Sequence, residues 1–139
     1  MADGSYLFVY GTLRRDAAHP MHRVLLRHAR AVGPARFSGL LYDLGPYPAA
    51  VPDPAGREEV SGELYRMGDA VKLFRKLDRY EGCYAESTAG PEYRRELREV
   101  VATDGRRLRA WIYLYNPPVD NLPRIRSGDY LARQPMGAR

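Results

Sequence analysis

Glu81 is a carboxylate that continues the apolar stripe of a predicted helix. Steps of three or four residues back from it reach Leu77, Phe74 and Ala70, which lie on one face of an α-helix. Desolvation and the negative end of the helix dipole both disfavour an anion there, and we expect both to raise its pKa. Such a carboxylate suits proton transfer near neutral pH. Glu81 is therefore a candidate general acid/base, unless it turns outward to the arginines of the same helix or is a plain surface acid.

The string Tyr10-Gly-Thr-Leu13 follows a short apolar run and is the second candidate element. Glycine allows a sharp turn, and the amides of successive residues that leave a strand can form an anion-binding nest. A nest of this kind would bind a carboxylate or stabilise an oxyanion. A simple turn explains the string equally well. It is not a phosphate loop, because the further glycines and the Lys-Ser/Thr pair are absent.

Tyrosine is the dominant aromatic residue, with 11 tyrosines against three phenylalanines and one tryptophan. Tyr10, Tyr47, Tyr113 and Tyr115 could line a polar pocket, or they could be partly buried and bonded to the backbone. The single cysteine, Cys83, excludes an internal disulfide and a multi-cysteine metal site. No other pattern of metal ligands is complete, so we expect no metal site.

The elements that must position these residues are mostly strands. Apolar runs and alternation predict strands over 6–10, 36–44, 59–67, 93–103 and 108–115, with a rigid loop over 45–49 and a hairpin turn at Asp104-Gly105. Helical periodicity predicts helices over 19–28 and 69–82, the second with Asp69 as N-cap and Gly82 as C-cap. This order favours an α+β domain built on a curved, partly closed antiparallel or mixed sheet.

The composition is that of a single globular domain of 139 residues. No apolar stretch approaches the ~18 residues of a membrane span, and the N-terminal residues lack the pattern of a signal peptide, so we expect a cytoplasmic protein without a membrane partner. The net charge is +5, but the 22 basic residues are spread along the chain without a basic block. A nucleic-acid partner is therefore not expected.

Several strings, in their order along the chain, resemble those of the γ-glutamylcyclotransferase-like, or AIG2-like, family. They are Tyr10-Gly-Thr-Leu-Arg14, Gly45-Pro-Tyr-Pro-Ala49, Val60-Ser-Gly-Glu-Leu-Tyr65, Leu77-Asp-Arg-Tyr-Glu-Gly82, Glu92-Tyr-Arg94, Ala110-Trp-Ile-Tyr113 and Ser127-Gly-Asp-Tyr130. The resemblance covers roughly residues 6–131 of one domain spanning 1–139, and it is to the γ-glutamylamine cyclotransferase-type branch. It implies a small mixed or antiparallel β-barrel with flanking α-helices and an internal cavity.

The resemblance also implies an activity. The loop Tyr10, Gly11, Thr12 and Leu13 matches the family loop that binds a γ-glutamyl group through backbone amides, and Glu81 matches the essential glutamate. The implied reaction closes the γ-glutamyl group to 5-oxoproline and releases an amine or amino acid. The attacking amine belongs to the substrate, so no cofactor is expected. Tyr47 and Tyr115 are further candidates for the cavity wall.

The partner implied is a small-molecule γ-glutamyl compound, whose leaving group could be an amino acid, an amine, an isopeptide or a biosynthetic intermediate. A non-catalytic protein that holds a small acidic metabolite in the same cavity is the alternative. The sequence does not fix an oligomeric state.

Overall fold

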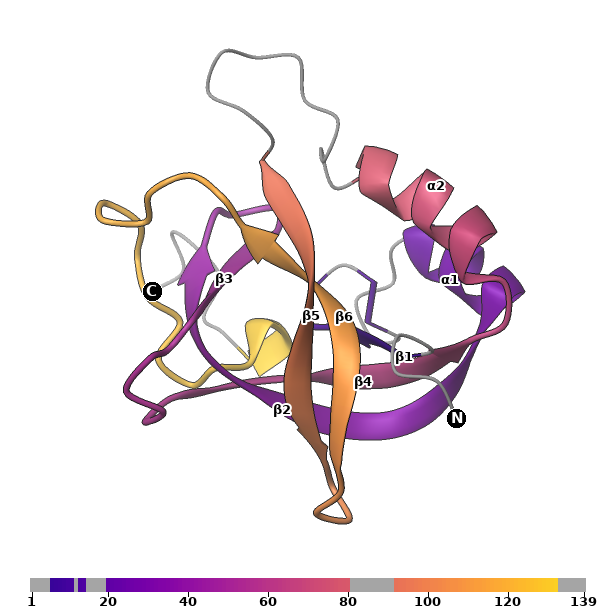
Figure 1. Cartoon of the computed structure of the whole chain (residues 1–139). Helices are drawn as coiled ribbons and strands as arrows, with labels where there is room; N and C mark the ends of the chain where they lie inside the picture. The colour runs from indigo at the N-terminus through magenta and orange to yellow at the C-terminus, as the bar shows by residue number, and fades with distance from the viewer. Residues whose placement is uncertain (1–5, 12, 15–19, 81–91, 133–139) are drawn as a thin grey trace.

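The computed structural model describes residues 6–11, 13–14, 20–80 and 92–132. These residues form six strands, two α-helices and a short 3-10 helix (Figure 1). The strands are β1 (Tyr6–Val9), β2 (Ala29–Asp43), β3 (Pro48–Pro52), β4 (Glu59–Met67), β5 (Tyr93–Ala102) and β6 (Arg107–Tyr115). The helices are α1 (Met21–His28) and α2 (Ala70–Tyr80), and the 3-10 helix is η2 (Tyr130–Ala132).

Five strands close into a barrel. The strand order is β2-β4-β1-β6-β5, and β5 pairs back onto β2, where Ala35 lies opposite Ala102. The β1–β6 pair is parallel, with Leu7 opposite Trp111, and the other pairs are antiparallel. Closure leaves these five strands without an unpaired edge. The predicted small mixed barrel with flanking helices is confirmed.

The strand β2 is longer than the sequence predicts. It begins at Ala29, directly after α1, whereas the pattern predicts a strand from residue 36. The first half of β2 is largely exposed and its register against β4 shifts between Ala31 and Gly33, so the apolar alternation typical of a strand is missing there.

The predicted loop over 45–49 is wrong for its last two residues, which belong to a strand. The strand β3 begins at Pro48, which lies opposite Asp43 of β2. The string is rich in proline, which cannot donate to a ladder and therefore indicates a loop. Among the described strands β3 pairs with β2 alone, and such an edge position is where a strand tolerates proline.

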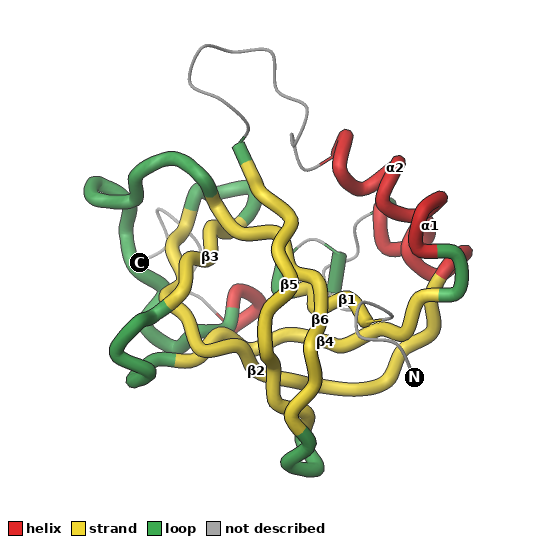
Figure 2. The backbone as a smooth tube through the Cα atoms, viewed as in Figure 1, coloured by secondary structure: helices red, strands yellow, loops and turns green. Residues whose placement is uncertain are grey.

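The two α-helices lie side by side on one side of the barrel, while the C-terminal segment crosses the opposite side (Figure 2). The predicted N-cap of α2 is confirmed, because the Lys72 amide donates to Oδ1 of Asp69 over 3.1 Å. The predicted cap Gly82 and the first predicted residue of the other helix, His19, lie outside the described residues. None of the described helices has the length and apolar character needed to cross a membrane.

Both faces of β1 are buried, which explains its unbroken apolar run. Phe8 belongs to the cluster inside the barrel, whereas Leu7 and Val9 belong to a second cluster with Leu25 of α1 and Leu77 of α2. The chain that leaves β1 therefore emerges between the barrel interior and the helices, at the place where the pocket lies.

Candidate functional site

A pocket opens at the C-terminal end of β1. It contains about 350 Å³ of empty space, part of which is open to solvent. Its wall comes from β1 and the residues after it, from the start of β3, and from β5 and β6. The lining residues are Phe8, Val9, Tyr10, Gly11, Leu13, Tyr47, Pro48, Tyr93 and Tyr113.

Gly11 brings the chain after β1 close to β3. A Cβ atom at this position would lie 2.7 Å from both Cγ and Cδ of Pro48, which is too close for any side chain. The carbonyl of Gly11 accepts a hydrogen bond from the Arg14 amide over 3.0 Å, so the chain turns here. The sequence-predicted residues Tyr10, Gly11 and Leu13 all line the pocket. Thr12 lies outside the described residues.

The same turn is held from α1. A ring nitrogen of His22, Nδ1, lies 2.9 Å from the carbonyl oxygen of Leu13 and donates to it. The His22 ring also packs edge-on against Tyr65 of β4, at 6.1 Å between the ring centroids. The backbone that lines the pocket therefore has a fixed support on its helix side.

Arg14 holds the turn from the other side. Its Nη1 lies 2.7 Å from Oδ1 of Asp129 and its Nε lies 3.6 Å from Oε2 of Glu63, and the Arg14 side chain is only 12% exposed. The hydroxyl of Tyr65 donates to the other oxygen of Glu63 over 3.0 Å. The C-terminal string 127–130 thus contacts the turn after β1, a connection that no spacing in the sequence indicates.

Three tyrosine hydroxyls build the wall by bonding to other parts of the protein. Tyr10 donates to the carbonyl of Tyr113 over 2.5 Å, and Tyr93 donates to the carbonyl of Pro48 over 2.6 Å. Tyr113 donates to Oδ1 of Asp78 over 2.6 Å. These bonds fix the three rings in place. For Tyr10 this agrees with the alternative in which the tyrosines are bonded to the backbone.

Of the two further tyrosines predicted for the wall, Tyr47 lines the pocket and donates to Oε2 of Glu92 over 3.0 Å. Tyr115 is not among the lining residues, and its ring packs edge-on against that of the lining residue Tyr93, at 5.5 Å between the centroids. Burial, and secondly the negative charge of Glu92, raises the pKa of the Tyr115 hydroxyl above its ordinary value of 10.0.

Asp78 is the buried acid of α2 in the described part of the chain, and sequence reasoning assigned it no role. Its two carboxylate oxygens accept hydrogen bonds of 2.8 and 3.0 Å from Nε and Nη2 of Arg95 on β5. The Arg95 guanidinium in turn lies 3.8 Å from the centroid of the Phe74 ring and 4.9 Å from that of Trp111. This network attaches α2 to the strands that carry the pocket wall.

Glu81, the predicted acid/base, follows α2 directly and lies outside the described residues. Within the described residues, no three His, Cys, Asp or Glu side chains gather where they could hold a metal ion. The described pocket is lined by the residues at the end of β1 and by four tyrosines.

Comparison with known proteins gives consistent matches over almost the whole chain. The family model described as gamma-glutamyl cyclotransferase, AIG2-like, matches residues 7–132. The gamma-glutamylcyclotransferase family protein YtfP of Escherichia coli K12 is 37% identical over 128 residues, which are 91% of this chain and 96% of that protein.

Solved structures are also similar to this chain. The solution structure of ytfP from Escherichia coli is similar with a TM-score of 0.62 at 34% identity, over 91% of this chain and 96% of that one. The crystal structure of an AIG2-like protein from Mus musculus has a TM-score of 0.65, covering 99% of this chain and 100% of that one, and at 24% identity it shows the fold alone. The ordered strings, the closed barrel and these matches lead to one conclusion: the chain belongs to the gamma-glutamyl cyclotransferase, AIG2-like family.

Proposed function

We propose that the protein converts a γ-glutamyl compound to 5-oxoproline and releases an amine or amino acid. The observation that carries the proposal is the pocket at the end of β1, where Gly11 and Leu13 of the family's loop lie against Pro48 and a wall of tyrosines. Apolar side chains and a few tyrosines line this pocket, a composition typical of sites that bind small molecules.

The reaction is an intramolecular acyl transfer. The α-amine of the glutamyl group attacks its own γ-carbonyl carbon, a new C–N bond closes the five-membered ring, and the C–N bond to the leaving group breaks. One proton moves from the attacking nitrogen to the leaving nitrogen, so the reaction needs no oxidant, reductant or cofactor. Holding the chain of the substrate bent is therefore a large part of the catalysis.

In this proposal Glu81 moves the proton. It takes the proton from the attacking α-amine as general base and returns it to the leaving nitrogen as general acid. Backbone amides around Gly11, Thr12 and Leu13 hold the glutamyl group and stabilise the negative charge that develops on the γ-carbonyl oxygen. Tyr47 forms part of the wall, and Tyr115 supports it through Tyr93. We further expect a cytoplasmic enzyme that uses neither nucleic acid nor a membrane as partner.

The test is to incubate the protein with a panel of γ-glutamyl amino acids and γ-glutamylamines and to measure 5-oxoproline. We expect product from at least one compound, and we expect Glu81→Gln to lower that rate by a factor of at least about 100, as is typical for the loss of a general acid/base. The matched control is Glu99→Gln, an exposed acid of β5 whose loss leaves the rate unchanged.

Two results would contradict the proposal in different ways. If Glu81→Gln retains the parent rate, the role of Glu81 is wrong although the activity stands. If γ-glutamyl compounds bind in calorimetry and none is converted, the protein is instead a binding protein that uses the same pocket.

A further inference from the structure

A second hollow lies where α1 leads into β2 and β4 leads into α2 (Figure 1). It contains about 710 Å³ of empty space, part of which is open to solvent. Its charged and titratable lining residues are Arg27, His28, Arg30, Arg66 and Asp69. Among the described residues, it shares no lining residue with the pocket at the end of β1. We call this separate feature the arginine groove.

The two chain segments that form the arginine groove are joined to each other. The Gly68 amide donates to the carbonyl of His28 over 2.8 Å. The C-terminal end of α1 and the N-terminal end of α2 meet at this place, and the dipoles of two such helix ends have opposite signs. The charged side chains therefore decide which ligands the groove attracts.

Two of the groove arginines face each other across the sheet. Arg30 of β2 lies directly opposite Arg66 of β4 in the ladder, and both line the groove. Residues in this relation have their side chains on the same face of the sheet and their Cβ atoms about 5 Å apart, and like charges there are destabilising. An anion between the two guanidinium groups would offset this repulsion, so the arrangement favours a bound anion.

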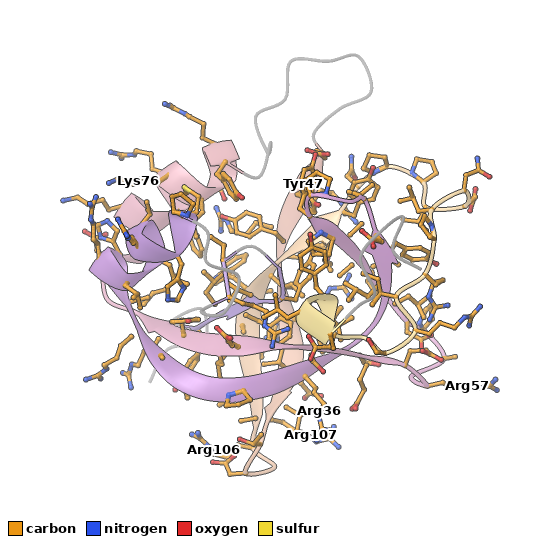
Figure 3. All side chains as sticks on the ribbon, turned by 180° about the vertical axis from the view of Figure 1, so that it is seen from behind. Arg36, Tyr47, Arg57, Lys76, Arg106 and Arg107 are labelled. Atoms are coloured by element: carbon orange, nitrogen blue, oxygen red, sulfur yellow. The ribbon has the colours of Figure 1, made fainter. Side chains whose placement is uncertain are left out.

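The same two strands combine opposite charges elsewhere. Arg36 lies further along β2, away from the helices (Figure 3), and its Nε is 3.6 Å from Oε1 of Glu59 on β4. In all, eight arginines of the described chain form ion pairs with acids. Within that part of the chain, neither Arg27 nor Arg30 has such a pair.

The groove therefore has an excess of positive charge. Its lining contains three arginines and one aspartate, which gives a net charge of +2 with His28 taken as neutral. The aspartate, Asp69, is engaged as the N-cap of α2, because its Oδ1 accepts a hydrogen bond from the Lys72 amide over 3.1 Å. A ligand with more than one negative charge would match this lining.

Phosphate is the anion that arginine binds best. A guanidinium group can donate two parallel hydrogen bonds to the oxygens of one phosphate group. A diphosphate group has oxygens on two phosphorus atoms, so that more than one guanidinium can bind it in this way. Leu26 of α1, which is 50% exposed, also lines the groove and gives it an apolar wall for an organic group attached to the diphosphate.

We propose that the arginine groove binds a small molecule that carries a diphosphate group. Arg27 of α1, Arg30 of β2 and Arg66 of β4 hold the two phosphates. The site does not depend on the proposed function, because the groove and the pocket at the end of β1 have separate linings. It adds a second class of ligand to this protein.

The test is calorimetry on the full chain at low salt, without divalent metal ions. Sodium pyrophosphate and ADP carry the diphosphate group, and inorganic phosphate and AMP are their controls with a single phosphate. We expect each control to bind about tenfold more weakly than its diphosphate counterpart, because it offers fewer charge-assisted hydrogen bonds. Tighter binding of ADP than of pyrophosphate identifies a nucleoside diphosphate as the source of the group, and the reverse order identifies the free ion.

Three variants locate the binding. Arg30→Gln should lower the affinity for pyrophosphate about tenfold, and Arg30→Lys about threefold, because lysine keeps the charge but loses the two-pronged hydrogen bonding. Arg75→Gln is the matched control: it removes the same charge from an exposed position of α2 outside the groove, and should leave the affinity unchanged.

Thermal unfolding gives a measurement independent of calorimetry. Without ligand, Arg30→Gln should unfold at the same temperature as the parent or a higher one, because the repulsion from Arg66 is removed. Pyrophosphate should raise the unfolding temperature of the parent more than that of Arg30→Gln, since a ligand stabilises the folded state in proportion to its affinity.

Four results would overturn the inference. Pyrophosphate may fail to bind at millimolar concentration, or bind no more tightly than inorganic phosphate. Arg75→Gln could lower the affinity as much as Arg30→Gln, which would indicate general attraction to a basic surface. If a short single-stranded oligonucleotide binds more tightly than pyrophosphate and loses affinity in Arg30→Gln, the groove belongs to a nucleic-acid surface and the small-molecule site is wrong.

Discussion

Arg14 and Asp129 are 115 positions apart in the sequence, yet their side chains form an ion pair with 2.7 Å between Nη1 and Oδ1. The pair connects the turn after β1 to the C-terminal segment. Because Leu131 donates its amide to the same oxygen of Asp129 over 3.0 Å, the carboxylate is itself held in place. The pocket wall at Gly11 and Leu13 thus depends on residues near the far end of the chain.

Replacement of Arg14 by Met is expected to impair substrate binding. The variant keeps most of the side-chain volume but removes the Arg14 charge that pairs with Asp129 and lies near Glu63, so the turn loses this support. We expect KM for a converted γ-glutamyl compound to rise about tenfold, with a smaller change in kcat. Steady-state assays of 5-oxoproline measure this. Arg36→Met, which removes an exposed ion pair with Glu59, is the control, and equal KM values in the two variants would contradict the prediction.

Replacement of Asp78 by Ala is expected to destabilise the fold. The Asp78 side chain is 7% exposed, and its loss leaves the Arg95 guanidinium and the Tyr113 hydroxyl without their shared acceptor. Removing one partner of such a pair costs about 3 kcal/mol in the free energy of unfolding. Guanidinium chloride titration measures this. Glu99→Ala, which removes an exposed ion pair, should lower the free energy of unfolding by only about 0–1 kcal/mol. Equal losses in both variants would show that the Asp78 network contributes no more to stability than an exposed ion pair.

Gly11→Ala tests the close approach of the turn to β3. The added Cβ would lie 2.7 Å from the Pro48 ring, so the turn must move away from β3 and displace the pocket wall. We expect kcat/KM to fall by about tenfold or more, since small displacements of a positioned substrate have large effects on rate. In the control, Gly68→Ala, the added Cβ would lie 3.5 Å from the His28 carbonyl, an ordinary contact. Unchanged activity in Gly11→Ala would refute the proposed contact of this turn with substrate.

The raised pKa of Tyr115 predicts that the protein loses stability at high pH. Its pKa in the folded protein is raised above 10.0, first by burial and then by the charge of Glu92. The folded protein therefore keeps a proton that the unfolded chain releases, and this contribution is fully present below pH 10.0 and lost as pH rises through the folded-state pKa. Thermal unfolding between about pH 8 and 11 should show a decline that is smaller in Tyr115→Phe. Identical declines in both proteins would contradict the assignment.

Local sequence patterns predicted the β5–β6 hairpin and the start of α2. The alternation around Asp104-Gly105 gave the β5–β6 hairpin, where Gly105 has φ of 88°, and Asp69 gave the start of α2. The first half of β2 escaped prediction because exposed residues there carry no alternation, and its strand conformation is set by pairing with β4. Pairing between distant strands cannot be predicted from the periodicity of a short stretch of sequence.

The site was predictable only in part for the same reason. Glycine after an apolar strand marked Gly11, but nothing local indicated that Pro48 would lie against it or that Asp129 would reach Arg14. Asp78 was missed because one acid beside Leu77 has the appearance of a surface residue until Arg95, 17 positions later, is placed opposite it. Helical spacing alone marked Glu81, and the order of the family strings added its implied role as the essential glutamate.

The β5–β6 hairpin ends in an exposed turn at the opposite end of the barrel from the start of β5, where Tyr93 lines the pocket (Figure 1). The Asp104 carboxylate accepts hydrogen bonds from the amide and the guanidinium of Arg106 in this turn, and a Cβ atom added at Gly105 would meet no atom within 4 Å. The turn is therefore a suitable place for a short peptide insertion or a tether. A protein immobilised on a sensor surface through this turn would present its pocket to the solution, so that candidate compounds could be screened by binding alone.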